Sequence, residues 1–184
     1  MEAPVTENPT GADLRPLALG DIERVLHWRN LPEVAAYMHT DHAISETEHV
    51  RWFADAMTDE SRKYWIIQSD GAPVGLVNLY DISPRHGRAY WAFYVAVPRL
   101  RGRGLGSGAE RFVLRYAFET LGLETLCCEV LATNQRGVKM HERFGFRIDG
   151  VLRQHVRKGG DRVDVVTMSL LREEWISGRW STDG

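Results

Sequence analysis

Glycines and arginines gather in one short segment, Val97-Pro98-Arg99-Leu100-Arg101-Gly102-Arg103-Gly104-Leu105-Gly106-Ser107-Gly108. Glycine lets the backbone turn tightly and lets a ligand approach bare N–H groups. The apolar spacing that follows is typical of a helix, and a helix N-terminus carries a partial positive charge. Arg101 and Arg103 add local positive charge. We therefore expect this loop to cradle a pyrophosphate group.

Two common nucleotide-binding loops fit this segment poorly. A Walker loop needs Gly-Lys-Ser/Thr after its glycines, and the segment has no such triplet. A dinucleotide-binding fingerprint needs Gly-x-Gly-x-x-Gly near the first strand of a βαβ unit. Gly102, Gly104 and Gly106 do not keep that spacing. Both interpretations are therefore weak.

The loop resembles the acyl-CoA loop of the GNAT acetyltransferases, Arg/Gln-x-x-Gly-x-Gly/Ala, with Arg101, Gly104 and Gly106 at its defining positions. A second segment, Asn134-x-x-Gly137-Val138-x-Met140-His141-Glu142-x-Phe144-Gly145-Phe146, is similar to that family's Asn-x-x-Ala-x-x-Leu-Tyr-x-x-x-Gly-Phe helix. The resemblance covers about residues 14–175. It implies the GNAT fold, a mixed α/β (α+β) architecture whose splayed central sheet is flanked by helices.

The resemblance also implies acetyl-CoA as the acyl donor. Pantetheine would lie between the strand that ends near Val97 and the strand 125–131, and pyrophosphate would lie on the loop amides. The residues implied for acetyl-CoA are Tyr94, Val95, Val97, Arg101, Gly102, Arg103, Gly104, Leu105, Gly106, Ser107 and Asn134.

The N-terminal half resembles a narrower group, the PseH-type transferases, through His27-Trp28-Arg29-Asn30-Leu31-Pro32-Glu33-Val34, Met38 and Glu48-His49-x-x-Trp52-Phe53. That group acetylates the 4-amino group of a UDP-linked 4-amino-4,6-dideoxy sugar during pseudaminic acid synthesis. The guanidinium group of Arg29 can donate two parallel hydrogen bonds to a phosphate, and flat side chains can pack against a uracil ring. The expected acceptor-binding residues are Trp28, Arg29, Met38, His49, Asn78 and Tyr80, although aromatic residues at helical spacing also fit a plain core.

Direct transfer needs a neutral amine and a proton donor for the departing thiolate. Glu129, in the middle of a strand beside the expected gap, is the candidate base. His141 stands where the family usually has a tyrosine acid, so it is the candidate proton donor, or else a core histidine. Cys127 and Cys128 lie inside an apolar run, where buried thiols are inert, so we expect no acyl-enzyme.

Three functions remain open from these residues. The first is acetylation of a UDP-amino-sugar, and the second is acetylation of a protein N-terminus, as in RimJ/RimL-like enzymes, or of another small amine. The third is a non-catalytic acyl-CoA-binding module. The pattern His39-x-x-His42 with Asp41 offers too few ligands for a metal, and we expect none.

The elements that position these residues follow from periodicity in a chain of 184 residues. We expect one domain over 13–176, with loose tails at 1–12 and 177–184. Alternating or β-branched runs predict strands near 14–19, 64–69, 73–80, 88–97, 125–131, 146–156 and 162–170. Helical spacing predicts helices after Gly20-Asp21, Pro32, Ser45, Gly104 and near 137–144.

Composition excludes several classes of function. The net charge of −2 offers no general basic field for nucleic acid or a membrane surface. A basic cluster, Arg153, His155, Arg157, Lys158 and Arg162, could receive a diphosphate, an acidic peptide or only solvent. No secretory signal or membrane-spanning stretch is evident, so we expect a cytoplasmic monomer or homodimer.

Overall fold

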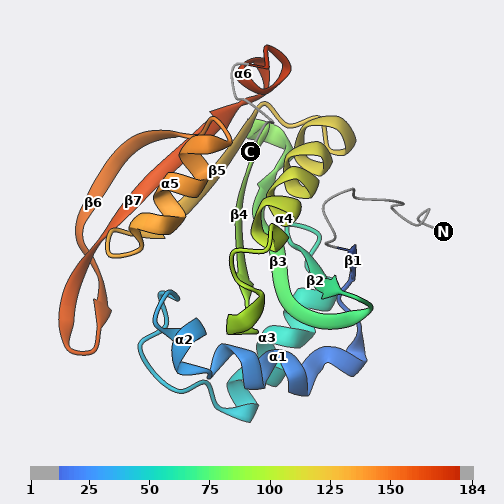
Figure 1. Ribbon diagram of the computed structural model, residues 1–184. Helices are drawn as coiled ribbons and strands as arrows, with labels where there is room; N and C mark the ends of the chain where they lie inside the picture. Colours follow the sequence, from blue (N-terminus) through green and yellow to red (C-terminus); the bar gives the residue numbers. More distant parts are fainter. Residues whose placement is uncertain (1–12, 179–184) are drawn as a thin grey trace.

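The computed structural model describes residues 13–178. Seven strands form one sheet in the order β1-β2-β3-β4-β5-β7-β6 (Figure 1). Their bounds are β1 (Asp13–Pro16), β2 (Lys63–Ser69), β3 (Ala72–Ser83), β4 (Arg88–Val95), β5 (Thr125–Leu131), β6 (Arg147–Lys158) and β7 (Asp161–Leu171). Of the tails expected at 1–12 and 177–184, only residues 177 and 178 lie among the described residues.

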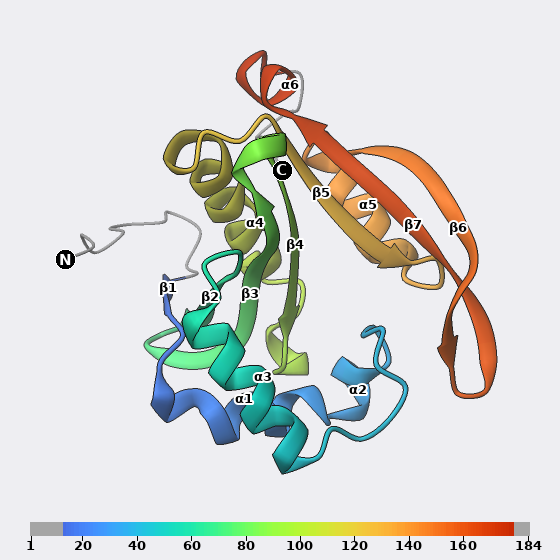
Figure 2. The same ribbon diagram turned by 180° about the vertical axis from the view of Figure 1, so that it is seen from behind.

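The sheet is splayed between β4 and β5. These two strands pair in parallel, but only where Arg88–Tyr90 lies beside Thr125–Cys127. Beyond Tyr90, β4 keeps its antiparallel pairing with β3, while β5 pairs along its whole length with β7. Figures 1 and 2 show the two strands diverging from that point. The mixed, splayed sheet expected from the sequence is confirmed.

Among the described residues, six α-helices flank the sheet: α1 (Ile22–Arg29), α2 (Pro32–Ala35), α3 (Glu46–Thr58), α4 (Leu105–Arg115), α5 (Gln135–Arg143) and α6 (Arg172–Ile176). Successive side chains of a strand point to opposite faces, so β4 contributes to two apolar cores. Trp91 joins the core that includes α4, whereas Tyr94 packs against the core that includes α1 and α3. Two cores, one on each face, therefore hold β4 in place.

Local signals in the sequence account for several boundaries. Ser45 caps α3, because its Oγ accepts a hydrogen bond from the Glu48 N–H at 3.2 Å. Asp70 and Gly71 both have positive φ, as the predicted β2–β3 hairpin requires. β5 has the predicted bounds, whereas β6 continues to Lys158 because an irregularity between Leu152 and Val156 adds residues to it.

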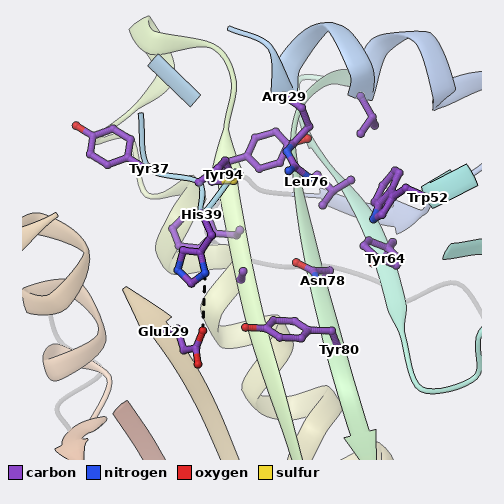
Figure 3. A pocket seen from close by; sticks show the side chains of 14 residues that line it. Arg29, Tyr37, His39, Trp52, Tyr64, Leu76, Asn78, Tyr80, Tyr94 and Glu129 are labelled. Atoms are coloured by element: carbon purple, nitrogen blue, oxygen red, sulfur yellow. Dashed lines mark ion pairs between the residues drawn. The ribbon is translucent and has the colours of Figure 1, made fainter. Parts of the chain in front are cut away.

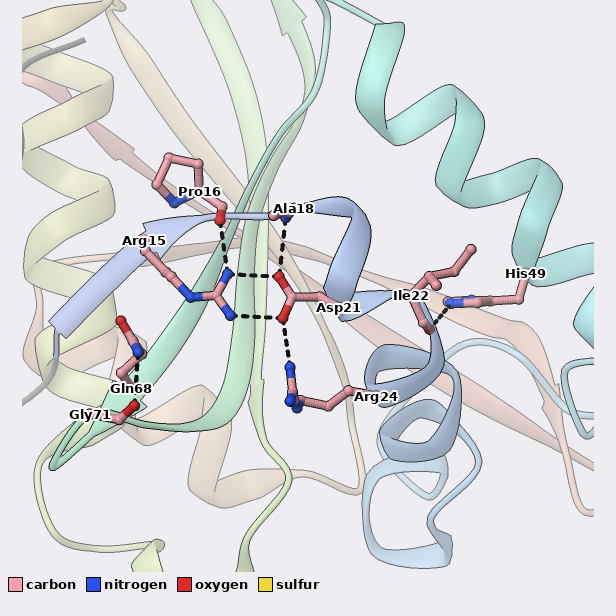
Figure 4. Close-up of polar contacts among 9 residues, drawn as sticks. All are labelled: Arg15, Pro16, Ala18, Asp21, Ile22, Arg24, His49, Gln68 and Gly71. Atoms are coloured by element: carbon pink, nitrogen blue, oxygen red, sulfur yellow. Dashed lines mark hydrogen bonds and ion pairs between the residues drawn. The ribbon is translucent and has the colours of Figure 1, made fainter.

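A buried carboxylate fixes the start of α1 (Figure 4). The two oxygens of Asp21 accept bonds from both terminal nitrogens of Arg15, each at 2.7 Å, and from Arg24 at 2.7 Å. The hydrogen bonds from Arg15 hold the pKa of this carboxyl below its usual range. The helix α1 that this carboxylate anchors ends at Arg29. Between residues 13 and 178, no helix is long and apolar enough to cross a membrane.

Candidate functional site

A cavity of about 200 Å³ opens beside the splayed gap, between the end of α1, the segment after α2, and strands β3, β4 and β5 (Figure 3). Most of its wall is aromatic or aliphatic, and it holds one carboxylate. The lining residues are Val25, Arg29, Tyr37, Met38, His39, Trp52, Tyr64, Leu76, Asn78, Tyr80, Ala92, Phe93, Tyr94 and Glu129.

Arg29 and Tyr94 meet at one end of the cavity (Figure 3). One terminal nitrogen of Arg29 donates to Thr40 Oγ1 at 3.2 Å. The Nε of Arg29 and the hydroxyl of Tyr94 are buried and have no hydrogen-bond partner within residues 13–178. Burial raises the pKa of the Tyr94 hydroxyl, which therefore stays protonated. Because unpaired buried polar groups are costly, this end is suited to a ligand that brings an anionic or carbonyl oxygen.

His39 and Glu129 face each other across the gap, and their Nδ1 and Oε2 atoms lie 3.9 Å apart (Figure 3). Burial lowers the pKa of His39; His155 and Lys158 lower it further, and Glu129 opposes the shift. The imidazole is therefore mainly neutral at pH 7 and can accept a proton, with a carboxylate beside it to stabilise the charge. Burial raises the pKa of the neighbouring Tyr80 hydroxyl, so Tyr80 remains a hydrogen-bond donor.

The structure gathers most of the predicted acceptor residues in this cavity. Arg29, Met38, Asn78 and Tyr80 line it together with Glu129. Trp28 does not line it, because the indole is buried and packs edge-on against the ring of Tyr94, 6.4 Å between centroids.

His49 is not brought to the cavity either. It is 3% exposed and donates a hydrogen bond from Nε2 to the Ile22 carbonyl at 2.7 Å (Figure 4). Its ring stacks on Trp52. The physical reason is helical spacing, which places His49 on the same face of α3 as the buried Phe53, against α1. His49 is a satisfied core histidine here, which corrects its predicted contact with the acceptor.

His141 also lies away from the cavity. Its Nδ1 is 2.8 Å from Oε1 of Glu110 on α4, and both side chains are buried. The ring meets Trp91 edge-on at 5.1 Å, on the face of β4 that packs against α4. Burial raises the pKa of Glu110, while the hydrogen bond from His141 opposes that shift. These contacts match the alternative in which His141 is a core histidine, and they bring no proton donor to the cavity.

The glycine-rich loop presents free backbone donors. Gly104 precedes α4 with φ of +85° and no side-chain cap, so the N–H groups of Leu105, Gly106 and Ser107 have no intrahelical partners. A Cβ at Gly106 would lie 3.0 Å from the ring of Phe93, so glycine lets the helix start approach β4 closely. The residues present therefore fit a pyrophosphate group.

The cations around this loop differ from those expected. Arg101 donates from Nε to the Val95 carbonyl at 3.0 Å and from a terminal nitrogen to the Glu33 carbonyl at 3.3 Å. Its guanidinium thus ties the loop to β4 and α2. A terminal nitrogen of Arg136 lies close to Gly102, within 3.3 Å of where its Cβ would be, so α5 supplies a cation near the loop alongside the exposed Arg103.

The other predicted acetyl-CoA residues lie along the splayed edge. Tyr94 and Val95 end β4 where β5 has diverged, and Val97 follows. Asn134 caps α5, because its Oδ1 accepts a bond from the Gly137 N–H at 3.0 Å. These positions surround the gap that would receive pantetheine, although Asn134 also has a structural role at its helix start.

Three functional candidates were missed from the sequence: His39, Arg136 and the side chain of Tyr94. His39 drew attention only through its spacing to His42, which instead pairs with Glu48 at 3.0 Å. Arg136 stands in the first turn after Asn134, a position that the similarity of that helix could have indicated. Among the described residues, no group of three or more His, Cys, Asp or Glu side chains is placed to hold a metal.

Known proteins resemble this chain over most of its length. The acetyltransferase (GNAT) domain family matches residues 13–147. Spermidine N(1)-acetyltransferase of Escherichia coli K12 is 24% identical over 164 residues, 89% of this chain and 88% of that protein. Acetyltransferase PseH of Campylobacter jejuni (serotype O:2) is 28% identical over 128 residues, 70% of this chain and 78% of that protein.

A solved structure agrees with the fold. Spermidine N-acetyltransferase from Vibrio cholerae, in complex with CoA and spermine, superposes with a TM-score of 0.84 at 23% identity, covering 91% of this chain and 99% of that one. GNAT acetyltransferases use acetyl-CoA, which accords with a glycine-rich helix start beside a splayed gap. Because the family match spans most of the sequence, this chain belongs to the GNAT family and is an N-acetyltransferase.

Proposed function

We propose that the protein transfers the acetyl group of acetyl-CoA to the 4-amino group of a UDP-linked 4-amino-4,6-dideoxy sugar. The observation that carries the proposal is the cavity itself, where an arginine with an unpaired buried nitrogen stands at the end of an aromatic wall. Arg29 is suited to a phosphate oxygen, and the aromatic surfaces are suited to uracil or a deoxysugar methyl group. The similarity to PseH over 70% of the chain supports the same acceptor class.

The charge of the cavity argues against a polyamine acceptor. Spermidine is a polycation, and its recognition calls for several carboxylates at amine spacing. Glu129 is the one carboxylate in the lining, and it stands opposite Arg29 and His39. An acceptor with one amine and a remote anionic group matches this distribution better than a chain of ammonium groups.

The proton balance of the reaction can be written with residues of the cavity. His39, neutral because burial lowers its pKa, takes a proton from the acceptor ammonium, and Glu129 stabilises the imidazolium that results. The acceptor nitrogen then bonds to the thioester carbonyl carbon, the carbon–sulfur bond breaks, and the second proton that the nitrogen loses on becoming an amide goes to the departing sulfur. Burial raises the pKa of Cys127 and Cys128, so neither thiol is a ready nucleophile, which favours direct transfer.

The donor would be held on the other side of the gap. The amides of residues 105–107, with Arg103 and Arg136, would bind its pyrophosphate, and the free edge of β4 would pair with its pantetheine amides. This arrangement would place the thioester near the point where β4 and β5 separate, within reach of the acceptor amine.

A three-acceptor assay tests the proposal. Acetyl-CoA is supplied with a UDP-4-amino-4,6-dideoxy-hexose, with spermidine, or with a peptide that has a free N-terminus. Products are identified by mass spectrometry, and rates are followed through the released thiol. We expect kcat/KM for the nucleotide sugar to exceed that for spermidine by at least about 100-fold.

Arg29→Met should raise KM for the nucleotide sugar about tenfold or more, because a charged contact to phosphate is lost. Arg51→Met, at an exposed position of α3, is the matched control and should leave KM unchanged. Acetylated spermidine or peptide with no acetylated nucleotide sugar would contradict the proposal and assign the other acceptor.

A further inference from the structure

The tip of the β6–β7 hairpin reaches the segment that follows α2, although the two are about 120 residues apart in the chain. Figures 1 and 2 both show the tip beside that segment. Lys158, the last residue of β6, donates from Nζ to the carbonyls of Ala35, Met38 and Thr40 at 2.6, 2.7 and 2.6 Å. The neighbouring Gly159 N–H donates to Asp41 Oδ1 at 2.7 Å.

This contact uses the hydrogen-bonding capacity of the ammonium group completely. A lysine ammonium has three N–H donors, and each of them meets one carbonyl here. Lys158 therefore has no N–H donor left for a phosphate. Its ammonium group is fully hydrogen-bonded to the carbonyl oxygens of Ala35, Met38 and Thr40. Charge-assisted hydrogen bonds are among the stronger ones, so three of them fix the path of an otherwise irregular segment.

The segment held in this way forms one wall of the cavity. Tyr37, Met38 and His39 lie between the bonded carbonyls, and all three line the cavity. On the inner side, Thr40 Oγ1 accepts a bond from Arg29, and His39 faces Glu129 of β5 at 3.9 Å. The position of the candidate base thus depends on a residue from the far end of the chain.

We infer that Lys158 is a positioning residue for the acceptor site: it anchors residues 35–41 to the C-terminal hairpin and so holds His39 opposite Glu129. The inference rests on the proposed function in taking this cavity as the acceptor site, whichever amine enters it. It makes the β6–β7 hairpin part of acceptor recognition, while the donor loop at the start of α4 is also tied to β4 through Arg101 and should be affected less.

Lys158→Met tests the inference, because methionine keeps an unbranched stem and removes all three donors. We expect KM for the acceptor to rise about tenfold and KM for acetyl-CoA to stay within about twofold. Lys63→Met, which removes an ammonium group from the exposed start of β2, is the matched control and should change neither constant. Asp41→Ala removes only the bond from Gly159 and should shift the acceptor KM in the same direction.

A second readout needs no acceptor. The groups that face His39 are Glu129, His155 and Lys158, and burial is the main cause of its lowered pKa. The His39 side chain is already 42% exposed; releasing the segment exposes it further and Lys158→Met removes the Lys158 charge, so NMR titration should show a higher pKa for His39. The signal is assigned by its loss in His39→Gln.

The outcomes separate this inference from the proposed function. If the nucleotide sugar is not acetylated, the proposed acceptor is wrong, and the kinetic comparison is made with whichever of the three acceptors reacts, alongside the titration. An unchanged His39 titration together with an unchanged acceptor KM in a folded Lys158→Met would overturn the inference. If Lys158→Met fails to fold, the same two measurements on Asp41→Ala decide.

Discussion

At the scale of single residues, the proposed chemistry depends on His39 and Glu129, which face each other across the splayed gap. Glu129→Gln keeps the shape of the side chain but cannot stabilise an imidazolium by charge. We expect kcat to fall about tenfold, because a partly exposed charge pair 3.9 Å apart is worth on the order of 1 kcal/mol, with acetyl-CoA affinity unchanged. Steady-state kinetics and calorimetry of acetyl-CoA binding check the two halves of this prediction. Turnover within about twofold of the wild type would exclude Glu129 from proton handling.

The pH profile identifies which group of the pair takes the proton. The base is active when neutral, and burial lowers the pKa of His39, so activity should be lost only as the pH falls below the usual histidine value of 6.5. His39→Gln should remove this acidic limb of kcat and lower the plateau. An acidic limb that persists unchanged in His39→Gln would assign the proton to another group.

The buried pair of Glu110 and His141 predicts a different pH effect, on stability. Burial raises the pKa of Glu110 from its ordinary value of 4.5. A carboxyl with a raised pKa stabilises the fold below its unfolded value, and this contribution is lost as the pH rises through the raised value. The free energy of unfolding of the wild type, relative to Glu110→Gln, should therefore fall as the pH rises above about 4.5.

Urea unfolding at several pH values measures this difference, and a difference that does not vary with pH would contradict the assignment. Glu110→Ala leaves the buried Nδ1 of His141 without its partner and should cost about 1 to 3 kcal/mol at low pH, and less as the pH rises. Turnover should be measured on the same Glu110 variants. A fall in stability with unchanged turnover would show that Glu110 and His141 have a structural role and take no part in the chemistry.

Residue types in the sequence predicted some residues of the site but not others. Arg29, Asn78, Tyr80 and Glu129 could be anticipated because a polar or charged side chain inside an apolar pattern needs a reason to be there. Trp28 and His49 could not be separated from the core, since helical spacing places both core and cavity residues on the inner side of α1 and α3. The partners of His141 and Lys158 lie far away in the chain, and no local pattern encodes such contacts.

At the scale of elements, the start of α4 carries the strongest prediction about acetyl-CoA. Gly104 has φ of +85°, where a side chain costs about 1 to 2 kcal/mol, while no atom crowds its Cβ position. Gly104→Ala should therefore distort the loop without a steric clash. We expect KM for acetyl-CoA to rise about tenfold, with the acceptor KM unchanged.

Gly122→Ala is the matched control for this substitution. Gly122 also has positive φ, +64°, and also has open space at its Cβ position, but it follows the far end of the same helical segment. Both variants should lose similar stability in thermal unfolding. An equal rise of the acetyl-CoA KM in both would show that the loop geometry at Gly104 has no special part in binding the donor.

The elements themselves were largely predictable because their signals are local. Alternating or continuous apolar runs marked all seven strands, and Ser45 marked the start of α3. The order of the strands was harder to obtain, since β7 lies between β5 and β6 although it follows both in the chain. Only the resemblance to a known family, not periodicity, indicated the splay that creates the site.

At the scale of the whole molecule, the splay divides the sheet into β1–β4 and β5-β7-β6, which share only the short parallel pairing of β4 with β5. The contact of Lys158 with residues 35–40 joins the two parts again at the opposite end. A ligand lying between β4 and β5 would add a further connection between the two strands. Acetyl-CoA should therefore stiffen strands from both parts, beyond the loop that holds its pyrophosphate.

Hydrogen–deuterium exchange measures this connection directly. Saturating acetyl-CoA should slow exchange at least about tenfold at residues 93–97 and 128–131 and in the loop 101–108. Adenosine 3′,5′-bisphosphate, which lacks the pantetheine arm, should protect the loop alone at equal occupancy. If both ligands protect the same residues, pantetheine does not lie in the gap, and the acyl group would reach the acceptor cavity by another path. Protection of both strands by acetyl-CoA alone would place the thioester where His39 and Glu129 meet, because the gap opens into that cavity.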